Sequence, residues 1–314
     1  MKVAININFD TLTDCLNLVG GRPLKATADP CFGPVMERFQ MLSEKFGAPL
    51  SLFVVARDLD NPSHREAVKK WAAMGHEIAN HSNTHRIDFA LLKKDDLKQE
   101  VEESHHKLCD LLGQSPHGFI APTWASSQPL SEVLSDFNYS YDCSLAPSWN
   151  LLLASLVLWS KSKQARKCAP VIRKDWFANL FGKTQPYIVS KQHYLKTSHS
   201  GTTIMLPLPS AYRFGIWHTL AHRLPDSVFD FLLEKAATKS KAFYYLMHPV
   251  DLLDFENDVL VNEDRYSLQN IERINIPISE KLRRVERSLE VLKSLGANFV
   301  TMSELASDAR ARLE

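Results

Sequence analysis

Two histidines in this sequence, His81 and His85, are spaced four residues apart, which can suit a metal ion. They end the stretch "GHEIANHSNTH", which lacks the glutamate that a helical zinc protease places between its histidines. Zinc takes imidazole and carboxylate ligands, and a catalytic site uses three protein ligands and keeps one position open for water. The two histidines could supply two of these ligands. Taken alone, the spacing is more typical of surface or structural histidines.

Other polar residues follow strand-like runs elsewhere in the chain. Asp10 follows "VAININF", His248 follows "AFYYLM", and Asp142 lies in "YSYDCS". In a barrel of parallel strands the carboxyl ends of the strands meet at one face, where the active site lies. Because the histidine stretch also follows an apolar run, we expect Asp10 to join His81 and His85, with "HSNTH" forming a loop that turns into a helix.

Strand-like and helix-like segments alternate along most of the chain. Period-two alternation and short apolar runs predict strands at 3–9, 50–55, 76–80, 117–121, 139–144, 203–208, 242–247 and 298–302. Apolar residues at helical spacing predict helices at 32–47, 61–75, 95–113, 227–239 and 279–296. A capping box of Ser63 and Glu66 is expected to start the second helix. This alternation predicts an α/β fold, an irregular or incomplete (β/α) barrel.

Composition limits the class of protein. The chain has 37 Lys and Arg against 36 Asp and Glu, which excludes a dedicated nucleic-acid partner, because phosphate contacts normally leave a basic surplus. The five cysteines are scattered and never paired as C-x-x-C, which fits a reducing compartment. We read no secretory signal, and the longest apolar run, 151–159, is far shorter than the ~20 residues that span a bilayer. We therefore expect a cytoplasmic protein with one domain over 1–314.

A basic, aromatic-rich insertion is predicted at about 149–199. This segment has nine Lys and Arg and one acid, Asp175, for a charge of +8, and aromatic residues are interleaved with these charges. Such a pattern is typical of an interfacial helix beside anionic lipid. The alternative is a solvated helical insertion that packs on the barrel.

Several of these stretches together resemble the polysaccharide deacetylases, the NodB-homology carbohydrate esterases. "GHEIANHSNTH" lies between "LSLFVVA" and "LGQSPHGFIAP", and "LEVLKSLGANFVTMSEL" is similar to the last helix and strand of that family. The likeness covers about 1–149 and 201–305. Within the family, "FDTLTD", "YSYDCS", "IMLPLPS" and "YYLMHPVD" look closest to the deformylases of 4-formamido-4-deoxyarabinose carried on undecaprenyl phosphate. Those enzymes also carry a membrane-associating insertion.

The resemblance implies a barrel of the deacetylase type that removes an acetyl or formyl group from an amino sugar at a divalent metal, usually zinc. Carried over residue by residue, Asp10, His81 and His85 would hold the metal. His248 would be the general acid that protonates the departing amine. A bound zinc ion polarises the amide carbonyl and acidifies water.

Other matched residues are expected around this centre. Asp142 would orient a histidine or bind sugar, and Asp251 would contact the substrate. Pro122 and Trp124 in "IAPTW" would shape the pocket wall. His76 also matches the family pattern and is expected either to support the residues that hold the metal or to have a packing role.

Two positions depart from the family pattern. Family members usually carry a second carboxylate as base, and the Asp-x-Asp spacing places Asn8 there. The Asp-Asp spacing would instead make Asp10 the base and Thr11 a ligand, and threonine is a poor zinc ligand. The arginine that supports the base is replaced by Ile120.

An amide cannot accept a proton at neutral pH, so Asn8 is not the base. Either His248 or hydroxide at the metal takes this step, Asp14 or Asp251 substitutes, or the protein is a weak catalyst. We therefore expect an amino-sugar deacetylase or deformylase, acting on a polyprenyl-linked or other glycolipid substrate at the inner face of the membrane. The alternatives are a non-catalytic carbohydrate- or lipid-binding descendant of the barrel, and a peptidoglycan or chitin deacetylase.

Overall fold

The chain is built around a curled, mostly parallel sheet, and its computed structural model describes residues 1–19, 21–22, 24–26, 28–153, 156, 180–260, 263, 265–269, 271 and 273–314. The strands are β1 (Lys2–Phe9), β2 (Leu50–Val54), β3 (Glu77–Asn80), β4 (Gly118–Phe119), β5 (Tyr141–Asp142), β6 (Tyr187–Ile188), β7 (Ile204–Met205), β8 (Ser210–Ala211), β9 (Phe214–Gly215), β10 (Phe243–Met247) and β11 (Asn298–Val300). Their order is β10-β1-β2-β3-β4-β5-β7-β6, with β11 also paired to β1 and β8-β9 apart as a hairpin. Only β6 runs antiparallel to its neighbour in the described part of the main sheet.

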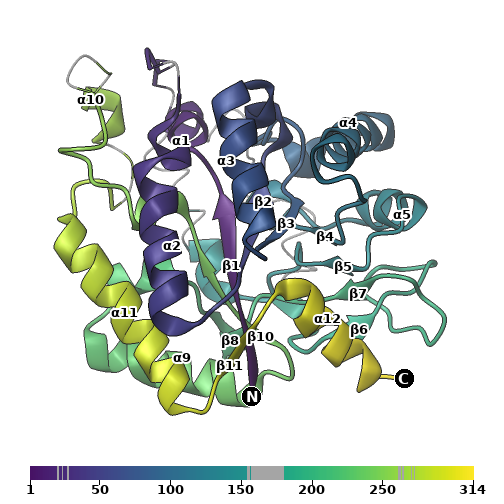
Figure 1. Cartoon of the computed structure of the whole chain (residues 1–314). Coiled ribbons are helices and arrows are strands. Elements are labelled where there is room, and N and C mark those ends of the chain that lie inside the picture. Colours follow the sequence, from purple (N-terminus) through teal and green to yellow (C-terminus); the bar gives the residue numbers. More distant parts are fainter. Residues whose placement is uncertain are drawn as a thin grey trace.

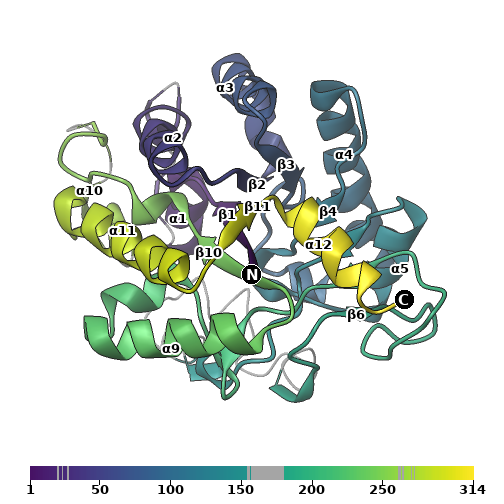
Figure 2. The same ribbon diagram turned by 60° about the horizontal axis from the view of Figure 1, so that its bottom comes forward.

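Helices surround this sheet on the outside (Figures 1 and 2). The α-helices are α1 (Leu12–Val19), α2 (Pro34–Phe46), α3 (Pro62–Ala73), α4 (Lys94–Leu112), α5 (Gln128–Asp136), α9 (Asp226–Lys239), α10 (Arg265–Leu268), α11 (Ile278–Ser294) and α12 (Met302–Ala311). Short 3-10 helices are η1 (Pro30–Phe32), η2 (Ala56–Asp60), η3 (Phe89–Leu91), η4 (Pro122–Trp124), η5 (His218–His222) and η6 (Pro249–Asp251). None of the helices in the described ranges is long and apolar enough to cross a bilayer.

The predicted irregular (β/α) barrel is confirmed, and among the described strands none closes the sheet between β6 and β10. Each predicted strand and helix is present within a few residues of its expected ends. The predicted capping box of α3 is wrong. The side chain of Asn61 caps this helix by accepting a hydrogen bond from Ser63 N at 3.0 Å, because the helix begins one residue before Ser63, at Pro62.

The basic segment at 149–199 is only partly described. Its last part belongs to the sheet, since β6 pairs with β7 through Tyr187 and Ile188. The central residues 157–179 lie outside the described residues, and they carry Trp159, Trp176, Phe177, Lys161, Lys163, Arg166, Lys167, Arg173 and Lys174. The bounds of the insertion stay a prediction.

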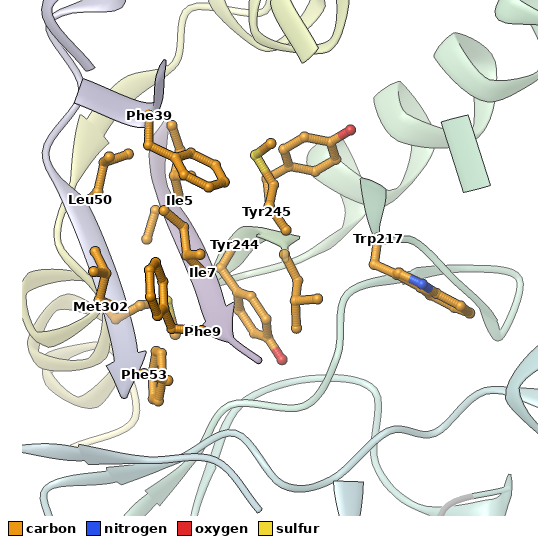
Figure 3. Close-up of a cluster of buried hydrophobic side chains, with 14 of the residues drawn as sticks. Ile5, Ile7, Phe9, Phe39, Leu50, Phe53, Trp217, Tyr244, Tyr245 and Met302 are labelled. Carbon is orange, nitrogen blue, oxygen red and sulfur yellow. The ribbon is translucent and has the colours of Figure 1, made fainter. Parts of the chain in front are cut away.

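The main hydrophobic core fills the space on both sides of β1 and β10 (Figure 3). Val3, Ile5, Ile7 and Phe9 have at most 2% exposure, which agrees with the apolar alternation of this strand. The intervening polar side chains are buried too, so β1 is covered on both faces, as is usual for a central parallel strand. This rigid strand fixes the position of Asp10, which follows it directly.

Glu77 ties four elements together at the amino ends of the strands. Its carboxylate accepts hydrogen bonds from Ser51 Oγ (2.7 Å) on β2 and from Tyr141 OH (2.7 Å) on β5. It also accepts from the backbone N–H of Ser303 at 2.9 Å at the start of α12. Tyr141 is fully buried, so its hydroxyl depends on this acceptor.

Replacing Glu77 with alanine is expected to lower the free energy of unfolding by about 2–3 kcal/mol, because several buried donors lose their acceptor together. Urea unfolding followed by circular dichroism measures the change. Glu66→Ala is the matched control, since Glu66 is exposed and forms an ion pair with Lys69 at the surface of α3. Its expected effect is within about 0.5 kcal/mol. Equal losses in the two variants would refute the role of Glu77.

Candidate functional site

The candidate site lies where β1 and β3 end. Asp10 directly follows β1, and His81 directly follows β3. The stretch 81–88 remains a loop, so the predicted turn of "HSNTH" into a helix is wrong. Ser82 and His85 have φ angles of 68° and 52°, in the left-handed region that side chains other than glycine rarely adopt. Backbone strain of this kind gathers at functional sites, and here it accompanies the return of His85 toward Asp10.

Asp10, His81 and His85 form one cluster. Oδ1 of Asp10 lies 3.0 Å from Nε2 of His81 and 3.3 Å from Nε2 of His85. One ligand-type atom from each residue lies within 4.8 Å of the other two, so the group could hold a metal ion. The side chain of His81 is 1% exposed, whereas those of Asp10 and His85 are 22% and 13% exposed. The cluster is therefore closed behind His81 and open to solvent beside Asp10.

The hydrogen bonds of His81 determine which of its nitrogens is protonated. Nδ1 lies 2.7 Å from the carbonyl oxygen of Ile120, which can only accept, so Nδ1 carries the hydrogen. In the neutral ring Nε2 then has a bare lone pair, which faces the carboxylate of Asp10. Two acceptors 3.0 Å apart repel each other unless a cation lies beside them. This arrangement fits a divalent metal, and the bond to Ile120 is the usual way a ligand histidine is oriented.

The charges in the cluster compensate one another. Burial opposes a positive charge on His85, but Asp10 and Asp14 raise the pKa of His85 to about 9. Burial also opposes ionisation of Asp10, yet His85 and His81 hold the pKa of Asp10 well below its usual range. A proton and a metal ion thus compete for the same lone pairs, because metal ligands bind in their deprotonated form.

An ion pair lies behind His85. Oδ1 of Asp14 accepts a hydrogen bond from Nη2 of Arg57 at 2.8 Å and lies 3.8 Å from Nδ1 of His85. Oδ2 of Asp14 accepts from the backbone N–H and the hydroxyl of Thr11 at 3.1 and 3.0 Å. The carboxylate is 2% exposed and fully engaged, so it stabilises His85 from behind and is not available to water as a base.

His248 faces the opposite side of Asp10. Its Nε2 lies 3.9 Å from Oδ2 of Asp10, and its side chain is 14% exposed. Burial lowers the pKa of His248 below its ordinary value, so the ring is neutral at neutral pH. Asn8 is 5% exposed on β1, and its Oδ1 has no hydrogen-bond partner among the described residues. The structure thus brings His248 to the cluster beside an amide that cannot act as a base.

The sequence has known relatives. A family model for polysaccharide deacetylase matches residues 22–141, a range that contains His81 and His85. A peptidoglycan deacetylase from Helicobacter pylori is 27% identical over 146 residues, which are 46% of this chain and 49% of that protein. The comparisons support a relationship of this chain to the polysaccharide deacetylase family. The aligned part spans about half the length of the Helicobacter protein.

Solved structures share the fold of the chain. A protein from Mycobacterium smegmatis assigned as a polysaccharide deacetylase has a TM-score of 0.60 at 16% identity, with 99% of this chain and 90% of that one covered. A protein from Pseudomonas aeruginosa with the same assignment has a TM-score of 0.56 at 14% identity, covering 98% and 89%. PuuE allantoinase has a TM-score of 0.56 at 15% identity, covering 99% and 89%. At these identities the likeness shows the deacetylase barrel alone.

Three further residues predicted for a deacetylase site are Asp142, Pro122 and Trp124. Asp142 is buried at the end of β5 and accepts a hydrogen bond from Ser144 N at 2.8 Å. It is paired with no histidine of the described ranges, so it does not orient one as predicted. Pro122 is buried in η4, and the ring of Trp124 packs 5.9 Å from that of Trp217. Because Trp124 is half-buried, its place in a pocket wall stays a prediction.

The structure argues against the predicted contact of Asp251 with substrate. Asp251 is the last residue of η6, and its side chain has 0% exposure. Its Oδ2 accepts a hydrogen bond from the backbone N–H of His248 at 2.8 Å, and its Oδ1 lies 3.2 Å from Nε of Arg273. Asp251 therefore fixes the turn that carries His248.

Some residues near the site were missed in the sequence. Arg57 was not predicted, although it lies in η2, shortly after the end of β2, and a position near a strand end was a usable signal. His218 and His222 repeat the four-residue spacing of His81 and His85 in "HTLAH". Arg273 follows no strand, and the sequence contains no sign of its pairing with Asp251.

His76 lies away from the candidate site. It lines a groove of about 520 Å³ at the opposite, amino-terminal ends of the strands. Its Nδ1 accepts a hydrogen bond from Leu50 N at 3.2 Å, and its Nε2 lies 2.8 Å from Oε1 of Gln40. Because both nitrogens are engaged, the structure assigns His76 a packing role.

His81→Ala and His85→Ala are each expected to lose the tightly bound equivalent of zinc, since a site of three protein ligands does not tolerate the loss of one. Inductively coupled plasma mass spectrometry after dialysis measures the zinc content. His106→Ala is the control, because His106 is exposed on α4. Unchanged zinc in both site variants would refute the assignment.

Proposed function

We propose that the protein is a divalent-metal-dependent hydrolase that removes an N-acyl group from an amino sugar. The observation that supports it best is the approach of His81 Nε2 to the Asp10 carboxylate at 3.0 Å, with His85 near Oδ1 and His248 near Oδ2 of the same carboxylate. Asp10, His81 and His85 would hold the metal. When bound there, the metal would polarise an amide carbonyl and acidify water, which is the activation that amide hydrolysis needs.

His248 would carry the proton between the two halves of the reaction. Its Nε2 faces the carboxylate of Asp10 and its side chain is partly exposed, so it can reach both a water molecule and a substrate nitrogen. The neutral ring would first accept a proton from the attacking water. The resulting imidazolium would then donate that proton to the departing amine, which makes His248 both base and acid.

Elimination supports this double role for His248. Asn8 cannot accept a proton, and the two carboxylates considered as substitutes are both engaged. Asp14 is held by Arg57 and Thr11, and Asp251 is held by Arg273 and the His248 backbone. Ile120 occupies the position of the family's supporting arginine and is fully buried in the core. Without a second carboxylate, that arginine would have no partner.

The finer proposal is a formyl or acetyl amino sugar on a polyprenyl-phosphate or similar lipid carrier. Support for the lipid comes from the sequence alone, through the basic and aromatic residues of 149–199 and the resemblance to the lipid-linked sugar deformylases. The Helicobacter relative favours a peptidoglycan-type substrate as the second candidate. A non-catalytic descendant of the barrel is the third, because Asn8 replaces the usual base.

Product analysis distinguishes these candidates. Zinc-loaded protein is incubated with N-formyl and N-acetyl amino sugars on polyprenyl phosphate, with peptidoglycan fragments and with allantoin. Acetate, formate and allantoate are then quantified. Release of formate or acetate from the lipid-linked sugars supports the finer proposal, and release from peptidoglycan supports the second candidate. Full metal content with no product from any substrate contradicts the hydrolase.

His248→Ala is expected to lower kcat by about 10²–10⁴-fold, the usual contribution of an acid–base group, and to keep the metal content of the parent. The measurement is steady-state hydrolysis with metal analysis of the same sample. Asn8→Asp is the companion variant, and if only a carboxylate is missing its activity equals or exceeds that of the parent. A His248→Ala enzyme with parental kcat would disprove the proton-transfer role.

Anionic vesicles are expected to bind the protein at low salt and release it as salt rises, since the attraction acts over a Debye length of ~8 Å at physiological ionic strength. Replacing Lys161, Lys163, Arg166 and Lys167 with glutamate should abolish flotation with the vesicles and spare turnover of a short soluble substrate. Matched reversals at the exposed Lys69, Lys70, Lys93 and Lys98 should leave flotation intact. Flotation of the first variant at the parental level would remove the support for a lipid-linked substrate.

A further inference from the structure

A second group of buried polar residues lies beneath the turn that carries His248. It consists of His218 and His222 on η5 and Asp251 on η6. One ligand-type atom of each lies within 4.8 Å of the other two. The rings of the two histidines are 4.9 Å apart and nearly perpendicular, at 87°. No hydrogen bond of the described residues engages His218 Nε2, either ring nitrogen of His222, or Asp251 Oδ1.

A chain of hydrogen bonds fixes the tautomer of His218. Ser288 donates its only hydroxyl hydrogen to the carbonyl of Arg284 at 2.8 Å, and Tyr245 donates its own to Ser288 Oγ at 2.9 Å. The oxygen of Tyr245 must therefore accept from Nδ1 of His218, which lies 2.6 Å away. Nε2 of His218 is left with a bare lone pair in a side chain of 0% exposure.

Nε2 of His218 and Oδ1 of Asp251 are acceptors that converge, and His222 adds one ring nitrogen with a lone pair and one with a hydrogen. The lone pair of His218 and the carboxylate of Asp251 face the same space, and His222 Nε2 lies 4.0 Å from Asp251 Oδ1. A buried acceptor without a donor or a cation is costly. Imidazole binds a metal in its neutral form, through the lone pair of a ring nitrogen.

We infer that His218, His222 and Asp251 form a second metal site, separate from the cluster of Asp10. Two imidazoles and one carboxylate select a borderline ion such as Zn²⁺ or Co²⁺ over Mg²⁺ or Ca²⁺. An anion does not fit, because the converging groups are a lone pair and a carboxylate. The bound ion would tie η5 to η6 and so fix the backbone of His248, which Asp251 already holds.

Nearby cations make this site the weaker of the two. Arg273 Nε lies 3.2 Å from Asp251 Oδ1. Lys281 donates to the carbonyls of Val250 and Leu253 at 2.9 and 2.7 Å, and Arg284 is paired with Glu280 at 2.6 Å. Arg273 is the cation that opposes a metal most directly, because it shares an oxygen of Asp251 with it.

Metal counting tests the inference independently of the proposed activity. The full chain, loaded with zinc and freed of excess by gel filtration, is expected to hold two equivalents by mass spectrometry. His218→Ala and His222→Ala should each hold one, His81→Ala should hold one, and His81→Ala/His222→Ala should hold none. When a chelator is added in steps, the zinc ion of the second site should be removed first. A parent with one equivalent that His218→Ala and His222→Ala retain would overturn the second site, while leaving the proposed hydrolase standing.

Arg273→Gln provides the second readout, and it guards against a histidine variant that fails to fold. Removing the charge of Arg273 is expected to lower the dissociation constant of zinc at the second site by about tenfold or more. The reason is that the guanidinium no longer competes with the ion for the carboxylate of Asp251. Zinc should also raise the thermal midpoint of Arg273→Gln more than that of the parent. Unchanged affinity and an unchanged zinc-induced shift would overturn the inference.

Discussion

The contact between His81 and Asp10 is the constraint on which the rest of the site depends. The carbonyl of Ile120 takes the hydrogen of Nδ1, so in the neutral ring Nε2 faces the Asp10 carboxylate with its lone pair at 3.0 Å. A proton or a metal ion between the two atoms makes that approach favourable. The strand β1 positions Asp10, which follows it directly. The left-handed backbone of Ser82 and His85 accompanies the placement of the third ligand-type atom, Nε2 of His85. The shape of this loop is therefore understandable as the support of a positively charged centre.

Two ion pairs flank the centre, one behind His85 and one beneath His248, and they give these two histidines different environments. Asp14 with Arg57 lies behind His85, where its negative charge favours a cation on or beside the imidazole. Asp251 with Arg273 lies beneath His248 and fixes its backbone. Since both carboxylates are engaged and buried, neither is left for proton transfer. The partly exposed His248 is the group beside Asp10 that remains suited to that task.

The sequence was sufficient for most of the sheet, for the five predicted helices and for the approach of Asp10, His81 and His85, because these depend on local patterns. It was not sufficient for α1, α5 and α12 or for the short strands β6, β8 and β9. Apolar alternation in 3–9 reflects the burial of β1, and a polar residue after a strand is a reliable sign of the carboxyl end of a barrel. The same reasoning failed where the decisive partner is distant in the chain. Arg273 meets Asp251 across 22 positions and Ser288 meets Tyr245 across 43, and neither pairing has a periodic signal. Asp251 was consequently predicted to contact substrate although it is fully buried.

Anomalous diffraction at the zinc edge, from crystals grown with zinc, is the measurement that tests the central claim most directly. A peak is predicted at ~2.0–2.2 Å from the carboxylate of Asp10, Nε2 of His81 and Nε2 of His85, the bonding distances of zinc to oxygen and imidazole nitrogen. The account also predicts that Nδ1 of His81 keeps its hydrogen bond to Ile120 in that crystal. Crystals saturated with zinc that show no anomalous peak among these three residues would contradict the account.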